Sequence, residues 1–269
     1  MNQTDIDRLK SIQLFLLDLD GTVYLHTTPI PGALEFINYL NLSGIGYLFL
    51  TNNSSRSAFE YVKKLSGMGF PVTREHVLTS GQVTGWYLEN KKPGATIYVV
   101  GTESLKTELA SYDLTLTENA NTVDYVVVGY DTELNYNKLC KACDYLRGDA
   151  VFIATNPDLV CPMGNNRYLP DCGSMCQLIE NTVKKQPIYI GKPHTKMIDY
   201  LRAQRAISRS AVAMIGDRLY TDIALGCNAG IMSVCTLTGE SDRLSIKKSD
   251  YQPDLIIESI AELLPILQS

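Results

Sequence analysis

The stretch LFLLDLDGTVYL, residues 14–25, decides how the chain folds. Its beginning, LFLL, is an unbroken apolar run, which is typical of a parallel strand covered on both faces. Two acids, Asp18 and Asp20, follow at once, and Gly21 allows a turn after them. Because side chains at positions i and i+2 of an extended chain point to the same side, a cation, a shared proton or a substrate must offset the repulsion between these carboxylates.

The composition limits the class of protein. The chain has 269 residues, of which 45% are hydrophobic, with a net charge of -5 and a pI near 5.3. This length suffices for one large or two modest domains. The acidic balance argues against nucleic acid or an anionic membrane as a partner. The polar start lacks the apolar core of a signal peptide, and no later stretch is apolar over the length of a membrane-spanning helix, so we expect a cytoplasmic protein.

The seven cysteines do not form a disulfide pattern. Their number is odd and they are scattered, as expected for reduced thiols in the cytosol. The motifs CKAC (residues 140–143) and CGSMC (residues 172–176) have spacings compatible with a zinc site. The helical spacing of residues 136–147 favours another interpretation, in which Cys140 and Cys143 fill the inner face of a helix.

Apolar stretches alternate with amphipathic helical stretches, which is the pattern of an α/β protein with parallel sheets. The candidate strands are residues 14–20, 46–52, 96–101, 125–130, 151–156, 187–193, 211–217 and 231–237. Those beginning at 14, 46, 187 and 211 end in polar groups beside Gly, Asn or Pro. Because ligands bind at the carboxyl edge of an open α/β sheet, we expect these strand ends to form one site.

The interval between the second and third of these polar ends carries strand and helix signals of its own. It therefore predicts an inserted domain with a separate small core. We expect a discontinuous core domain, residues 1–80 and 186–269, and an inserted α/β domain, residues 81–185.

The DLDGT motif, residues 18–22, suits phosphoryl transfer. One carboxylate can attack a phosphoryl group and form an aspartyl-phosphate, while the other can protonate the leaving oxygen and then deprotonate water. Attack of an anion on an anionic phosphate requires a hard cation such as Mg²⁺ with oxygen ligands. A calcium-binding loop is excluded because Pro29 stands where that loop needs its last acid. Alone, the motif is also compatible with surface acids at a strand end.

Two further strand ends carry groups that suit a phosphate. The Thr51 hydroxyl and the backbone N–H groups that follow, in the run Asn52–Asn53, can hold phosphate oxygens, although such residues also cap helices. Lys192 offers a compact positive charge, although a lysine at a turn can equally lie on the surface.

The last strand end adds acids. Asp217 can complete the oxygen shell of a cation with Asp18. Asp222, five residues further on, can add a ligand directly or through water, or it can cap a helix.

In this order the motifs DLDGT, TNNSSR, IGKP and GDRLYTDI resemble the haloacid dehalogenase superfamily, and are most similar to its NagD-like and p-nitrophenyl phosphatase-like members. The resemblance covers nearly the whole chain and implies a Rossmann-like parallel sheet in the core. It also implies Asp18 as nucleophile and Asp20 as acid and base. Implied Mg²⁺ ligands are Asp18, the Asp20 carbonyl and Asp217, with Asp222 at the metal site as a support for Lys192 and for the waters bound to the metal.

The resemblance extends to substrate binding. It implies that Thr51, Asn52, Asn53 and Lys192 bind the phosphate of a small phosphorylated metabolite. Because too few residues separate Asp18 from Thr51 for a cap at that point, it implies a cap of the α/β (C2) type at residues 81–185. Such a cap closes over the core and excludes water. Family members commonly form homodimers through it.

Within the implied cap, residues 154–175 resemble the segment that faces the active site in the family. Cys161 is a candidate substrate contact; a pyridoxal-phosphate phosphatase has histidine there, which argues against that substrate. Packing as a half-buried filler is the alternative for this thiol. Asp171 stands where the family often has a small residue, and can lie at the mouth of the site or point into solvent.

The leading hypothesis is a Mg²⁺-dependent phosphatase of small phosphomonoesters, with nucleoside monophosphates and sugar or glycerol phosphates as candidate substrates. One alternative is a non-catalytic phosphate-binding or scaffold protein with the same fold. Another is a phosphotransferase, which passes the phosphoryl group to an acceptor other than water.

Overall fold

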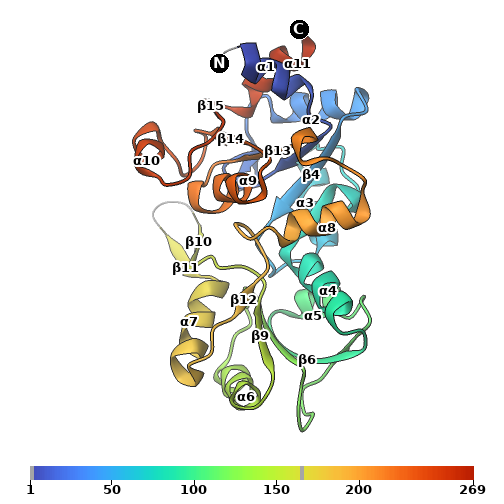
Figure 1. Ribbon diagram of the computed structural model, residues 1–269, viewed down its shortest axis with the longest axis vertical. Coiled ribbons are helices and arrows are strands. Elements are labelled where there is room, and N and C mark those ends of the chain that lie inside the picture. The colour runs from blue at the N-terminus through green and yellow to red at the C-terminus, as the bar shows by residue number, and fades with distance from the viewer. Residues whose placement is uncertain (1–2, 164–166) are drawn as a thin grey trace. The chain divides into compact units, whose positions relative to one another are not determined.

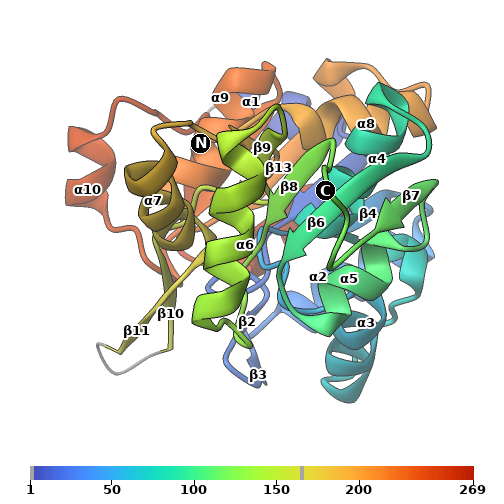
Figure 2. The same cartoon turned by 90° about the horizontal axis from the view of Figure 1, so that it is seen from below.

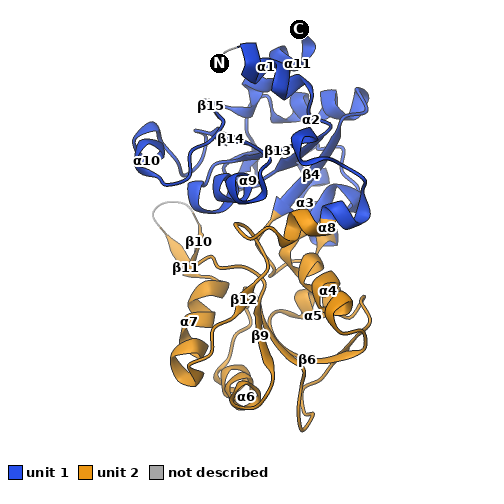
Figure 3. Cartoon of the chain, in the orientation of Figure 1, with its two compact units in different colours: residues 1–50, 59–78, 201–269 blue, residues 51–58, 79–200 orange. Residues whose placement is uncertain are grey.

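A computed structural model describes residues 3–163 and 167–269 of the chain (Figure 1). The chain divides into two compact units (Figure 3). Unit 1 holds residues 1–50, 59–78 and 201–269, and unit 2 holds residues 51–58 and 79–200. A parallel sheet with helices forms the centre of each unit, so the predicted α/β, Rossmann-like class is confirmed. The segment predicted to be inserted, residues 81–185, lies within unit 2.

The centre of unit 1 is a six-stranded sheet in the order β15-β14-β13-β1-β4-β5. Its strands are β1 (Leu14–Leu17), β4 (Gly46–Thr51), β5 (Val77–Thr79), β13 (Val212–Gly216), β14 (Met232–Thr236) and β15 (Leu255–Ile257). β1 lies between β4 and β13, parallel to both, and all four of its residues are buried. The chain first adds β4 and β5 on one side of β1 and later returns to add β13 on the other. This reversal of strand order between β1 and β13 is the point where open α/β sheets bind ligands.

Helices and short turns surround this sheet. They are α1 (Gln3–Lys10), α2 (Ala33–Leu42), α3 (Ala58–Gly67), η1 (Arg74–His76), η2 (Arg209–Ala211), η3 (Leu219–Ile223), α9 (Ala224–Ala229), α10 (Arg243–Lys248), η4 (Ile260–Glu262) and α11 (Leu263–Gln268). The helix α8 (Lys196–Gln204) begins in unit 2 and ends in unit 1. A hairpin of β2 (Tyr24–Leu25) and β3 (Thr28–Pro29) follows the DLDGT motif. Among the helices of the described residues, none has both the length and the apolar character needed to cross a membrane.

The centre of unit 2 is a five-stranded parallel sheet in the order β12-β9-β8-β6-β7. Its strands are β6 (Ala95–Val100), β7 (Leu114–Leu116), β8 (Tyr125–Val128), β9 (Val151–Ala154) and β12 (Ile188–Tyr189). The prediction that the strand before Lys192 shares a sheet with the other three polar strand ends is wrong, because β12 pairs with β9. A short apolar strand looks the same in either sheet, so the sequence pattern could not assign it.

The other elements of unit 2 cover this sheet. They are α4 (Ser80–Lys91), α5 (Glu103–Leu109), α6 (Tyr136–Arg147), α7 (Cys172–Val183) and a hairpin of β10 (Val160–Pro162) and β11 (Tyr168–Pro170). α6 and α7 pack together on the apolar core of the unit (Figure 2). Cys143 of α6 is buried, but Cys140 is exposed, so the prediction that both thiols face inward holds only for Cys143.

The strand order of the unit 2 sheet also reverses, between β6 and β8. Residues 51–58 bind to the segments that follow these two strands. The Tyr130 N–H, just after β8, donates to the Ser54 hydroxyl oxygen at 2.9 Å. Ser54 also shares a hydrogen bond of 2.8 Å with the Thr155 hydroxyl. The Thr102 hydroxyl, just after β6, donates to the Ser55 carbonyl at 3.0 Å. The segment that follows β4 is therefore a structural part of unit 2.

Candidate active site

Three acids meet where the strand order of unit 1 reverses. Asp18 follows β1 and Asp217 follows β13, which are neighbours in the sheet. One carboxylate oxygen from each of Asp18, Asp217 and Asp222 lies within 4.8 Å of the others. Among the described residues this is the single group of His, Cys, Asp and Glu side chains arranged to hold a metal ion, so the cysteine motifs do not form the zinc site considered above.

Of the two predicted ligands that directly follow a strand, Asp217 is more buried than Asp18. Its Oδ2 accepts the Glu240 N–H at 2.7 Å, whereas its buried Oδ1 has no hydrogen-bond partner. Burial raises the pKa of Asp217 to about 8, and the charges of Asp18 and Asp222 act in the same direction. A cation beside these oxygens would both pair the orphaned atom and offset the repulsion, so the residues fit a divalent metal of the Mg²⁺ type.

Glycines make room for the Asp217 carboxylate. Gly21 has a φ of +87°, and a Cβ there would lie 2.5 Å from Asp217 Oδ2. A Cβ on Gly239, in the loop after β14, would lie 1.9 Å from the same oxygen. The Thr238 hydroxyl joins this loop to the Gly21 carbonyl at 2.6 Å. Sequence reasoning missed the loop, although the Gly-Glu pair at residues 239–240, one residue beyond a predicted strand, was a signal of the same kind as the other strand ends.

Asp222 lies on a π-helical turn, η3, and is fully buried. Its carboxylate accepts the backbone N–H of Arg218 at 3.1 Å. The N-cap residue of α9 is Ile223. Asp222 therefore does not cap α9, and the alternative that it is a helix cap is wrong. Turns of this kind are frequent at functional sites. Arg218, which sequence reasoning did not single out, forms an ion pair of 3.3 Å with Glu240.

Asp20 lies in the turn after β1, and its side chain is exposed. Desolvation of the carboxyl nevertheless raises its pKa. The Lys64 charge lowers this pKa, and the Asp18 charge raises it further. The Lys64 Nζ lies 3.9 Å from the centre of the Tyr24 ring. A raised carboxyl pKa is what a proton donor requires.

Thr51 is the last residue of β4 and is 6% exposed. Its hydroxyl oxygen accepts the Asn53 N–H at 3.2 Å. The side-chain Oδ1 of Asn53 accepts the backbone N–H and the hydroxyl of Ser55, at 2.9 and 2.7 Å. Because α3 begins only at Ala58, Asn53 stabilises a turn and does not cap that helix.

Lys192 is 2% exposed, so the alternative of a surface lysine is wrong. The side-chain amide of Asn52 binds the Lys192 backbone, with its Oδ1 accepting the N–H at 2.8 Å and its Nδ2 donating to the carbonyl at 2.9 Å. The sequence predicted both residues in a phosphate site but did not indicate that the Asn52 side chain binds the Lys192 backbone.

The predicted substrate segment, residues 154–175, lies in unit 2, except that residues 164–166 fall outside the described residues. Cys161, on β10, is partly buried against the apolar core. Asp171 is 5% exposed and caps α7, where its Oδ1 accepts the Cys172 N–H at 2.6 Å. The alternative that Asp171 points into solvent is therefore wrong.

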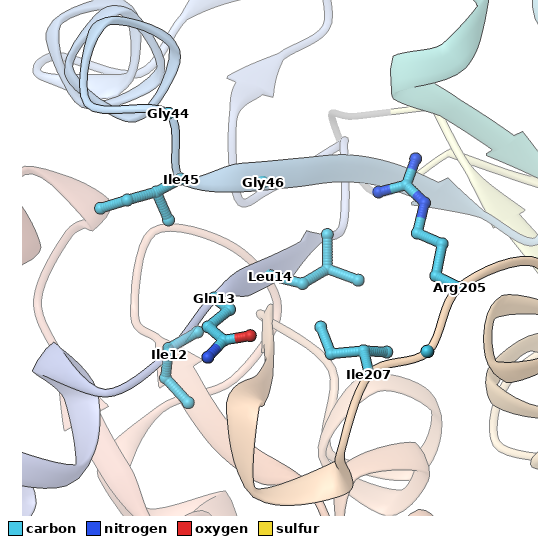
Figure 4. Close-up of a pocket in the computed structure, with 9 residues that line it drawn as sticks. Ile12, Gln13, Leu14, Gly44, Ile45, Gly46, Arg205 and Ile207 are labelled. Carbon is cyan, nitrogen blue, oxygen red and sulfur yellow. The ribbon is translucent and has the colours of Figure 1, made fainter.

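Figure 4 shows a pocket of about 490 Å³ in unit 1, which lies at the amino ends of β1 and β4. Leu14 and Gly46, the first residues of β1 and β4, line it together with Arg205 and Ile207. Because Asp18 follows the carboxyl end of β1, this pocket does not contain the acids.

Family models match both parts of the chain that carry these acids. The models are described as haloacid dehalogenase-like hydrolase, at residues 15–115, and HAD-hydrolase-like, at residues 189–263. An acid sugar phosphatase of Staphylococcus haemolyticus (strain JCSC1435) is 37% identical over 245 residues, which cover 91% of this chain and 92% of the relative. The chain belongs to the haloacid dehalogenase-like hydrolase family.

Solved structures identify the group within the haloacid dehalogenase-like hydrolases. A 4-nitrophenylphosphatase from Thermotoga maritima matches with a TM-score of 0.92 and 37% identity, over 97% of this chain and 99% of that one. A structure described as a putative nagD protein matches with a TM-score of 0.88 and 37% identity, over 95% of this chain and 98% of that one. The predicted resemblance to the NagD-like and p-nitrophenyl phosphatase-like members is confirmed.

Proposed function

We propose that this chain is a phosphatase that hydrolyses small phosphomonoesters through an aspartyl-phosphate on Asp18. The observation that carries the proposal is the group of three acids at the switch point of the unit 1 sheet. Relatives that match most of the chain bear the names of phosphatases, which supports the same activity.

In the proposed reaction, an Asp18 oxygen attacks phosphorus while the bond to the ester oxygen breaks. Asp20 donates its proton to the departing oxygen, and the raised pKa of its carboxyl supports this role. The resulting Asp20 carboxylate then takes a proton from water, whose oxygen attacks phosphorus. This second step releases phosphate and restores both acids.

The Asp18, Asp217 and Asp222 carboxylates and the Asp20 carbonyl would hold Mg²⁺, an assignment supported by an all-oxygen donor set and the orphaned Asp217 oxygen. A bound cation of this kind supplies positive charge that lowers the repulsion between carboxylate and phosphate. Arg218, beside these acids, supplies part of the same compensation from the protein itself.

We assign phosphate binding to the Thr51 hydroxyl, Asn53 and the Lys192 ammonium, as the family resemblance implies. Asn52 would contribute through its effect on Lys192. Cys161 and its segment would contact the rest of the substrate as part of a cap that includes residues 81–185. The name of the Staphylococcus relative favours sugar phosphates, with nucleoside monophosphates and glycerol phosphate as comparisons. A cytoplasmic location and a homodimer formed through unit 2 are further expectations.

The test is phosphate release from sugar phosphates, nucleoside monophosphates, glycerol phosphate, pyridoxal phosphate and 4-nitrophenyl phosphate. Each compound is assayed with Mg²⁺ and with EDTA, and Asp18→Asn serves as the blank because the amide is nearly isosteric but a poor nucleophile. We expect release that requires metal and is abolished in the blank. No release from any compound would favour a phosphate-binding scaffold, and transfer of the group to added alcohols would favour a phosphotransferase.

A further inference from the structure

The side-chain amide of Asn52 is the centre of a buried polar network in unit 2. Its Nδ2 donates to the Lys192 carbonyl at 2.9 Å and to the Asp158 carboxylate oxygens at 3.2 and 3.3 Å. Its Oδ1 accepts the Lys192 N–H at 2.8 Å. Since an asparagine amide has two N–H donors, both are committed. The amide thus pairs with both polar groups of the Lys192 backbone, as a neighbouring strand would.

The network is shielded from water and tightly packed. Asn52, Asp158 and Lys192 are 6%, 9% and 2% exposed. A Cβ on Gly191 would lie 2.5 Å from the Asn52 Oδ1, so this approach of the two segments requires glycine. In such surroundings hydrogen bonds are stronger, and a mismatched polar group is costly.

Asp158 itself is held by the turn that precedes it. Its N–H donates to the Asn156 Oδ1 at 3.0 Å, and the Asn156 Nδ2 donates to the Asn52 carbonyl at 2.7 Å. The turn after β9 therefore binds Asn52 at both its backbone and its side chain.

The Asp158 carboxylate decides which way the Asn52 amide faces, because both of its oxygens accept from the Asn52 Nδ2. A carboxylate only accepts hydrogen bonds, so it attracts the amide NH₂ and repels the amide oxygen. If the amide turned over, its oxygen would meet the carboxylate and both bonds to the Lys192 backbone would be mismatched. A neutral amide in place of Asp158 could pair with either face and would not enforce this orientation.

We propose that Asp158 is a positioning residue, which acts through the Asn52 amide to fix the backbone at Lys192 and thereby the direction of its ammonium group. The inference rests on the proposed function, in which Lys192 binds the phosphoryl group.

The experiment is a double-mutant cycle on kcat/KM for 4-nitrophenyl phosphate in the Mg²⁺-loaded enzyme. Asp158→Asn is made alone and together with Lys192→Met. We expect Asp158→Asn to lower kcat/KM roughly tenfold or more when Lys192 is present, since misplacement of a binding group costs at least this much. In the Lys192→Met background the same change should have no further effect. Asp158→Ser is used if thermal unfolding shows that Asp158→Asn does not fold.

Asp131→Asn is the matched control, because Asp131 is also a buried acid of unit 2, 2% exposed, and pairs with Lys138 at 2.8 Å. Its effect should be the same with and without Lys192. If Asp158→Asn lowers kcat/KM equally in both backgrounds, or not at all, the positioning inference is wrong while the proposed function stands. If Lys192→Met itself retains full activity, the role given to Lys192 in the proposed function fails, and the inference fails with it.

Discussion

The two oxygens of the Asp217 carboxylate differ in their surroundings, since one accepts a backbone N–H and the other is buried without a partner. Such an atom destabilises the metal-free protein and becomes an advantage only when a cation is bound. The same residue is therefore expected to have opposite effects on stability in the two states.

Asp217→Asn should remove much of the repulsion among the three acids, so the metal-free variant should unfold at the same temperature as the unmodified protein or above it. Mg²⁺ at about a hundred times its Kd should stabilise the unmodified protein by about 2.7 kcal/mol, on the order of 5 °C in Tm. The variant should show little of this shift. Calorimetry in EDTA and in Mg²⁺ measures both quantities, and equal Mg²⁺ shifts in the two proteins would exclude Asp217 as a ligand.

At the scale of single residues, sequence reasoning found the charged groups of the site but not the hydrogen bonds that position them. Asp18, Asp217 and Asp222 were predictable as a cluster because each follows a strand or its first turn, and the structure brings them together. The Asn52 amide could not be assigned, because its partners lie more than a hundred positions away in the sequence.

Among the short elements, η1 depends on the protonation state of a histidine. The Thr73 N–H donates to the His76 Nδ1 at 3.1 Å, and the His76 ring stacks on Tyr47 with centres 4.4 Å apart. Burial lowers the pKa of His76 below its usual 6.5; the Glu75 charge opposes this and the Arg205 charge supports it. A protonated Nδ1 could not accept the Thr73 N–H.

Because the pKa of His76 is lower in the folded state, its contribution to stability is complete above pH 6.5 and is lost as the pH falls below that value. His76→Asn keeps an acceptor oxygen in a similar place but does not titrate. We therefore expect the free energy of unfolding of the variant to fall less between about pH 8 and about pH 5. Urea unfolding of both proteins across this range measures the difference. The other histidines contribute equally to both proteins, so their effects cancel. Parallel curves for the two proteins would contradict the assignment.

The C-terminal end of α6 is stabilised by the lysine that follows α7. The Lys185 Nζ donates to the carbonyls of Ala150, Gly148 and Leu146 at 2.9, 3.1 and 3.3 Å. Lys185→Met should lower the free energy of unfolding by about 1–3 kcal/mol, since bonds to a charged donor are lost. Lys184→Met is the control, because Lys184 is exposed and methionine, which is also unbranched, suits its φ of +58° no worse than lysine does. Chemical denaturation compares the two, and an equal loss in both variants would argue against this role.

Most elements were predictable from the sequence because apolar periodicity reports burial. LFLL became β1, and residues 136–147 became α6. The assignment of β12 to a sheet was not predictable, because pairing with β9 rather than β1 depends on contacts distant in the sequence. The hairpin of β10 and β11 was also missed, since its strands are short and exposed on one side.

For the whole molecule, the acids and the Lys192 network lie in different units, and this predicts how they respond to truncation. Replacing residues 81–185 with a short linker removes Asp158 and Asn156 but leaves the sheet that carries the three acids. The truncated protein should still unfold cooperatively and gain stability from Mg²⁺, yet lose most phosphatase activity. Circular dichroism and phosphate release provide the two readings. A product that does not fold would show that unit 1 depends on the deleted residues.

Strand order reverses in both sheets, but the two reversals have different consequences. In unit 1 the reversal is lined by acids, whereas in unit 2 Ser54, Ser55 and Thr102 occupy it and bond to one another or to the strand ends. A mononucleotide docked into the second sheet by analogy with nucleotide-binding proteins of similar topology would collide with the chain's own backbone. Inhibitor searches should therefore not treat the switch point of the unit 2 sheet as a binding site. A compound that bound there would have to displace the loop that carries Thr51 and Asn52.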